Sequence, residues 1–244
     1  RLESAYLVYK WISQNIKINE NKEEESISKV YESGFGNPAG LASLFNRMCS
    51  FLDLESDSIS GFFKIYSGDI ESTWNYVVIK GEYYLIDVRL GCEFKVLESI
   101  ESEFVQKDIF FGTEPEVFIR LHYPKEKKWQ LLSEPYTLER FQSMPLLTPY
   151  FFMLNFKSLS PDTNTLQKSG AITLTFDESI QFTDIKIDSL EGDNSGKKAE
   201  FNFSKGKVEV KYNIDEIGNT SVINIKKNNF DFYFSIIIYK IDNF

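Results

Sequence analysis

The spacing of apolar residues changes once along the chain, and this change restricts the folds open to it. Up to about residue 52, apolar side chains recur at every third or fourth position, as in helices with one buried face. Two helices are predicted at 5–16 and 27–34. A third has the clearest stripe, made of Leu41, Leu44, Phe45, Met48, Cys49 and Leu52. Asn37 is expected to cap this third helix and Pro38 to open its first turn.

Beyond that point, short runs rich in β-branched and aromatic residues predict strands. The runs at 59–66, 74–79 and 82–88 indicate an antiparallel meander, the last two joined by a tight turn at Lys80 and Gly81. Further alternating strands are predicted at 172–176, 184–187, 201–203, 208–212, 222–225 and 232–239. Helices followed by runs of strands predict the α+β class.

We expect two domains in the 244 residues. Residues 1–150 are predicted to form helices packed on an antiparallel sheet, ending in a folded, proline-interrupted connector from about residue 104. Residues 151–244 are predicted to form an all-β, sandwich-like domain, because short strands separated by polar turns are typical of β-sandwiches.

Composition excludes several function classes. The net charge of −9 disfavours nucleic acids and anionic membranes as partners. No apolar stretch approaches the roughly 20 residues of a membrane-spanning helix, so no membrane insertion is expected. Cys49, Cys92 and the single histidine, His122, are too few for a thiolate or multi-histidine metal site. With no phosphate-binding glycine loop or calcium loop either, we expect no cofactor and no metal.

The start of the chain gives an expectation about location. Arg1 to Ala5 lead directly into a helical pattern, with no initiator Met and no signal peptide. We therefore expect a segment of a longer protein, working in the cytoplasm.

Three segments share the order and spacing of a known catalytic framework: Gly36 to Phe45, Ser72 to Asn75, and Tyr83 to Asp87. Together they resemble the transglutaminase-like superfamily, which has the papain-like cysteine-protease fold. In that superfamily a Gly-x-Cys-x-Gly segment opens a helix and a His-x-Trp-Asn segment begins a strand. An aspartate in the following strand completes a Cys-His-Asp triad.

A later segment indicates a subgroup of this superfamily. Residues Pro115 to Pro124, followed by Trp129 to Leu132, are similar to the segment after the core in kyphoscoliosis-peptidase-type members. Those members include animal muscle proteins and fungal cytokinesis proteins.

The resemblance places the nucleophile at Pro38, the base at Ser72 and the orienting acid at Asp87. Proline has no side-chain heteroatom, and a serine hydroxyl is no general base near neutral pH. The framework therefore predicts a pseudoenzyme whose triad is degenerate. Asn37, Trp74 and Asn75 are the candidates for lining what remains of the substrate groove.

Other residues could in principle carry chemistry. Cys92 follows Gly91 and is expected to be the more exposed thiol, which leaves open an active thiol peptidase or transamidase with a rearranged centre. Cys49 lies in an apolar stripe and is expected to be inert. His122 is expected to be a structural histidine, and Asp87 to bond to backbone or to a nearby base such as Arg89.

The resemblance implies a protein-interaction or regulatory scaffold in a larger cytoskeletal or cytokinesis protein. Its partners would be other proteins, at the division site or the cytoskeleton. A third reading, ligand or carbohydrate binding by the aromatic-rich β-region, stays open.

Overall fold

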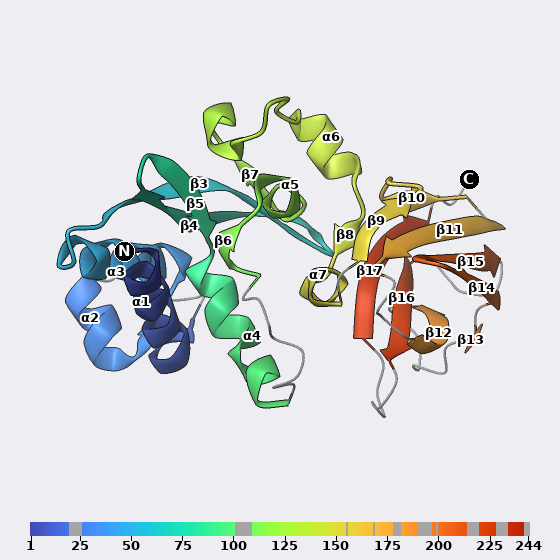
Figure 1. The fold of residues 1–244 in the computed structure, drawn as a ribbon, viewed down its shortest axis with the longest axis horizontal. Coiled ribbons are helices and arrows are strands. Elements are labelled where there is room, and N and C mark those ends of the chain that lie inside the picture. Colours follow the sequence, from blue (N-terminus) through green and yellow to red (C-terminus); the bar gives the residue numbers. More distant parts are fainter. Residues whose placement is uncertain are drawn as a thin grey trace. The chain divides into compact units, whose positions relative to one another are not determined.

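The chain forms two compact units in a computed structural model that describes residues 1–19, 26–100, 109–154, 156–167, 169–177, 182–189, 197–198, 200–213, 220–227 and 234–241 (Figure 1). Unit 1 comprises residues 1–64 and 68–136, and unit 2 comprises residues 65–67 and 137–244. Unit 1 combines helices with an antiparallel sheet, and unit 2 is mainly strands, so the α+β prediction is confirmed.

Unit 1 contains the elements that position the candidate site. They are α1 (Leu2–Asn15), β1 (Lys17–Ile18), α2 (Ile27–Ser33), β2 (Phe35–Gly36), α3 (Pro38–Ser50), β3 (Glu55–Ile65), β4 (Gly68–Ile79), β5 (Glu82–Ile86), α4 (Val88–Ile100), β6 (Phe111–Thr113), α5 (Pro115–Phe118), β7 (His122–Pro124) and the 3₁₀ helix η1 (Lys127–Gln130). The order of strands in its main sheet is β6-β5-β4-β3-β7.

Local sequence explains where α2 begins and ends and where α3 begins. The Ser26 side chain accepts a backbone N–H in the first turn of α2, and Gly34 ends that helix with a φ of 69°, which glycine adopts without strain. α3 begins as predicted, because the Asn37 side chain accepts the Gly40 N–H at 2.8 Å and Pro38 occupies the first helical position.

Helix α4 is the main element that the sequence did not predict. A strand was expected to continue to residue 88, but β5 ends at Ile86 and Asp87 caps the new helix by accepting the Leu90 N–H at 2.9 Å. Glycine disfavours helices, so Gly91 is a local signal against a helix here. The structure shows a different reason for this glycine, because a Cβ at this position would collide with the Tyr9 ring on α1. Its missing side chain allows α1 and α4 to approach closely.

The two faces of the main sheet have different partners. Asn75 on β4 faces α3, where its Nδ2 donates to the Ala42 carbonyl at 3.0 Å. Successive strand residues point to opposite faces, so Trp74 faces the other way. Its cluster on that side consists of Ile59, Leu85 and Phe118, with Tyr76, Trp129 and Leu131 packed against it.

Unit 2 has two sheets with apolar inner faces. Its elements are α6 (Leu138–Ser143), β8 (Leu146–Leu147), α7 (Pro149–Met153), β9 (Phe156–Ser160), β10 (Thr165–Leu166), β11 (Ser169–Phe176), β12 (Phe182–Ser189), β13 (Lys197–Lys198), β14 (Glu200–Ser204), β15 (Lys207–Asn213), β16 (Thr220–Lys227) and β17 (Phe234–Ile241). One sheet has the order β10-β17-β16-β12-β13 with β8 beside β17, and the other has the order β14-β15-β11-β9. Both sheets bury alternating apolar residues, as in a β-sandwich.

The boundary between the units differs from the one expected at residue 150. Residues 137–150, assigned from sequence to the first domain, group with unit 2. Leu147 pairs with Ile237, and the Thr148 N–H donates to the Ile236 carbonyl at 3.0 Å. These contacts join the predicted connector to the last strand.

Candidate functional site

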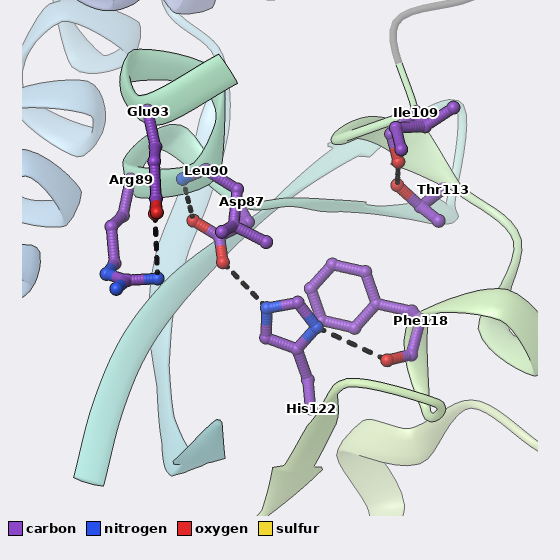
Figure 2. A network of polar contacts seen from close by, with 8 residues as sticks. All are labelled: Asp87, Arg89, Leu90, Glu93, Ile109, Thr113, Phe118 and His122. Carbon is purple, nitrogen blue, oxygen red and sulfur yellow. Dashed lines mark hydrogen bonds and ion pairs between the residues drawn. The ribbon is translucent and has the colours of Figure 1, made fainter. Parts of the chain in front are cut away.

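Asp87 lies between β5 and α4 and uses both oxygens of its carboxylate (Figure 2). Oδ1 accepts the Leu90 N–H at 2.9 Å, which caps α4. Oδ2 lies 2.6 Å from Nε2 of His122, and the Asp87 side chain is 1% exposed. The carboxylate is therefore held by one backbone group and one side chain.

His122, at the start of β7, is surrounded by aromatic side chains. Its ring stacks on Phe118 at 3.9 Å between centroids, and it meets Trp74 at 5.0 Å and Phe63 at 5.2 Å. Nδ1 lies 3.2 Å from the Phe118 carbonyl oxygen, so Figure 2 shows the imidazole between that carbonyl and the Asp87 carboxylate. The side chain is 2% exposed.

Both ring nitrogens of His122 face an oxygen atom, so the imidazole can hydrogen-bond on both sides. Hydrogen bonding at both needs one proton on Nδ1 and one between Nε2 and Asp87 Oδ2. The two side chains then have no net charge together, which lowers the cost of burying them. A general base needs a nitrogen within reach of the proton that it removes. Both nitrogens here already have partners.

Arg89 was the expected partner of Asp87 and lies elsewhere. Its Nη1 is 3.5 Å from Glu93 Oε2, one turn further along α4, and its guanidinium lies 4.8 Å from the centre of the Phe63 ring. The expectation that backbone bonds Asp87 is confirmed by Leu90, whereas the base beside it is His122.

The other two triad positions carry no base and no thiol. Pro38 is the first residue of α3 and is half-buried. Ser72 is 8% exposed on β4, two residues before Trp74 and on the same face of that strand. The histidine that approaches Asp87 therefore comes from β7 and not from the position on β4 where the resemblance places the base.

Comparison with known proteins agrees with the framework. The chain is 25% identical to the mouse (Mus musculus) kyphoscoliosis peptidase over 191 residues, covering 72% of this chain and 29% of that protein. It is 28% identical to the Lim and transglutaminase domain protein ltd-1 of Caenorhabditis elegans over 202 residues, covering 71% of this chain and 28% of that protein. This chain is a homologue of the kyphoscoliosis peptidases. Drosophila melanogaster Hillarin matches at 25% identity over 177 residues, covering 62% of this chain and 21% of that protein.

The kyphoscoliosis-type, transglutaminase-like resemblance seen in the sequence is thereby confirmed. No family model matches the chain. The matched region spans less than a third of the length of these relatives, so the chain corresponds to one transglutaminase-like part of larger proteins. The similarity to fungal cytokinesis proteins stays a prediction.

The residues proposed to line the old groove do not share one surface. Trp74 is 1% exposed, in the apolar cluster on one face of the sheet. Asn75 is fully buried on the opposite face, where it bonds to Ala42 and Asn46 of α3. Asn37 caps α3. Adjacent strand positions alternate between faces, so a motif contiguous in sequence is split in the fold.

Both thiols are buried. Cys92 is the more exposed of the two, as expected, but it is still buried: it is 5% exposed, with Sγ 3.8 Å from the Ile12 carbonyl oxygen of α1. Cys92 directly follows Gly91, which packs against the Tyr9 ring of α1. Cys49 is fully buried as expected, and burial raises the pKa of its thiol to about 11.

Sequence reasoning missed the pairing of His122 with Asp87. The two residues are 35 positions apart, and no local pattern joins them. A usable signal existed, since a lone histidine between apolar residues requires a polar partner when it is buried. Within the described part of the chain, no helix is long and apolar enough to cross a membrane.

Proposed function

We propose that this chain is a catalytically inactive transglutaminase-like domain that binds other proteins. The observation that carries the proposal is the proline at the first position of α3, where the resemblance puts the nucleophile. Proline keeps the helix start, because its fixed φ suits that position. It supplies no atom that could attack a carbonyl carbon.

The His122–Asp87 pair supports the same proposal. In a working triad the acid orients the histidine and the second ring nitrogen faces the nucleophile. Here the second nitrogen faces the Phe118 carbonyl oxygen, and the ring is 2% exposed. This arrangement suits a buried structural link.

We further propose that the domain is an interaction or regulatory scaffold within a larger cytoskeletal or cytokinesis protein. It would act in the cytoplasm, at the division site or on the cytoskeleton. The relatives support the larger context, since the match covers only 29% of the mouse protein. The net charge of −9 favours protein partners over nucleic acids.

The catalytic half of the proposal is tested by turnover. The chain and its Cys92→Ser variant are assayed for cleavage of unstructured peptides and for incorporation of a fluorescent amine into a glutamine-containing protein. We expect both proteins to match the buffer blank. Turnover that disappears in Cys92→Ser would overturn the proposal in favour of an active thiol peptidase or transamidase.

The binding half is tested by capture and reconstitution. The immobilised chain is exposed to lysate of its source organism, and a protein that elutes under native conditions is purified and titrated back. We expect a saturable, reversible complex. A bound product that survives full denaturation would instead indicate covalent chemistry.

A further inference from the structure

A group of three aromatic rings lies on the sheet face that also carries Trp74 and Leu85. Tyr76 of β4 stacks on Trp129 of η1 at 4.6 Å between centroids, and Tyr83 of β5 meets Trp129 at 5.8 Å and Tyr76 at 5.4 Å. The strand register gives all three a common side, because Tyr76 pairs with Leu85 and Tyr83 is two residues from Leu85. We call Tyr76, Tyr83 and Trp129 the aromatic platform.

One side of the aromatic platform packs against the buried cluster of the sheet, and the platform is partly exposed to solvent. Tyr76 and Trp129 pack against the buried cluster that contains Trp74. Tyr83 is 47% exposed, and Tyr76 and Trp129 are half-buried. Rings fixed in this way lose little conformational freedom when a ligand covers them, which favours binding.

The chain itself places a cation on this surface. The Lys128 Nζ lies 4.9 Å from the centre of the Trp129 ring, a cation–π distance. Glu126 accepts from the same Nζ at 2.8 Å, and this hydrogen bond raises the pKa of Lys128. Trp129 is therefore already in contact with an ammonium group of the chain itself, which is paired with Glu126.

Two further carboxylates lie beside the rings. Burial raises the pKa of the Tyr76 hydroxyl, and the negative charges of Asp57 and Glu55 raise it further, so both acids act electrostatically on the aromatic platform. They alternate along β3 with Ile59, a member of the cluster beneath the rings, so they face the same side as the rings. Both are exposed, and the structure records no ion pair for either among the residues that it describes.

We propose that the aromatic platform, with Asp57 and Glu55, binds an extended segment of a partner protein that carries lysine or arginine at alternate positions. This inference rests on the proposed function and names the chemistry of the partner. Asp57 and Glu55 are two residues apart on one strand, about 7 Å, which is also the spacing of alternate side chains of an extended peptide. Two such cations can meet both acids, and the rest of the segment can reach the exposed ring of Tyr83 on β5, two strands away.

The test titrates the whole chain with short peptides. One peptide has lysines at its second and fourth positions, separated by glycines, and matched peptides have arginine or glutamate there. The indole N–H signals of Trp129 and Trp11 are followed by NMR. We expect the lysine and arginine peptides to shift the Trp129 signal and leave Trp11 unmoved, and the glutamate peptide to shift neither.

Variants on exposed positions separate specific recognition from general attraction to an acidic chain. Tyr83→Ala and Asp57→Asn should each weaken binding by roughly three- to fivefold, the size expected of one exposed cation–π or charge contact. Glu3→Gln removes an equal charge on α1, and Tyr31→Ala removes a ring from another exposed stack, with Trp11; both should bind as the unaltered chain does. Unchanged thermal unfolding confirms that each variant is folded.

Three results would overturn the inference: no binding of the lysine and arginine peptides, equal affinity for the glutamate peptide, or affinities for Tyr83→Ala and Asp57→Asn that match those of the Glu3→Gln and Tyr31→Ala controls. These failures are distinct from failure of the proposed function, which the turnover assay and the capture experiment decide. If the chain shows no turnover and binds none of the three peptides, only the inference about the aromatic platform is refuted.

Discussion

Replacing His122 with phenylalanine tests whether its link to Asp87 stabilises unit 1. Phenylalanine keeps a ring against Phe118 and Trp74 but removes both nitrogens. The Asp87 carboxylate, 1% exposed, would then keep only the Leu90 N–H as a partner, and water could not replace the lost group. Breaking a buried charge pair by removing one member costs about 3–5 kcal/mol, so we expect His122→Phe to lower the free energy of unfolding by that amount.

Asp87→Asn is the matched milder change. The amide oxygen can still cap α4 by accepting the Leu90 N–H, and the amide NH₂ can donate to His122 Nε2. The expected loss is about 1–2 kcal/mol, since one charged hydrogen bond becomes a neutral one. The double variant has no buried charge, so its loss should fall short of the sum of the single losses by about 2 kcal/mol.

Urea titration followed by tryptophan fluorescence suits this measurement. The three tryptophans of the chain, Trp11, Trp74 and Trp129, all lie in unit 1, so the signal reports that unit. With a slope of roughly 2 kcal/mol per molar urea, His122→Phe should lower the midpoint by about 2 M. A loss below about 1 kcal/mol, or additive single and double variants, would refute the view that the two side chains are a coupled buried pair.

Three further predictions concern the packing around the site. Gly91→Ala should lower the stability of unit 1 by roughly 1–3 kcal/mol because its Cβ would collide with Tyr9; a gain of about 1 kcal/mol in urea titration, normal for this change in a helix, would show that α1 and α4 are not so close. Cys49, with its pKa raised by burial to about 11, becomes a thiolate only as the pH approaches that value. Its alkylation by iodoacetamide at pH 8 should therefore be roughly a hundredfold slower in the native than in the urea-unfolded chain, and equal rates would contradict its burial. Asn37→Ala should cost about 1 kcal/mol through loss of the bond to the Gly40 N–H, whereas Asn37→Ser should retain most of the stability in the same titration.

Elements specified by neighbouring residues were the predictable part of the fold. Helix α3 has its cap at Asn37, its proline at position 38 and most of its apolar stripe within a short stretch of sequence, and these are found where expected. The inclusion of Leu52, the last residue of the predicted stripe, was wrong: the helix ends at Ser50 and Leu52 is 48% exposed. Helix α4 has its cap at Asp87, but the capping residue also ends a strand, and Gly91 gives a local signal against a helix. The reason for Gly91 is the Tyr9 ring on α1, far away in the sequence.

The features that the sequence did not predict depend on contacts between residues far apart in the chain. Residues 137–150 contain the short strand β8, whose Leu147 pairs with Ile237, a partner about 90 positions later. The candidate site has the same difficulty. The resemblance named Asp87 from a local motif, whereas His122 is brought to it only by the path of the chain through α5 and β7.

Asp87 makes two contacts that stabilise the fold and do not depend on catalysis. It caps α4 through Leu90 and satisfies a buried ring nitrogen of His122, and neither contact involves residue 38. An aspartate at the acid position of a transglutaminase-like framework is therefore no sign of activity by itself. The informative position is the start of α3, because a helix can begin with proline or with cysteine but only the thiol can form an acyl intermediate. In this chain the aspartate at the acid position links the first turn of α4 to β7, the strand at the edge of the sheet opposite β6.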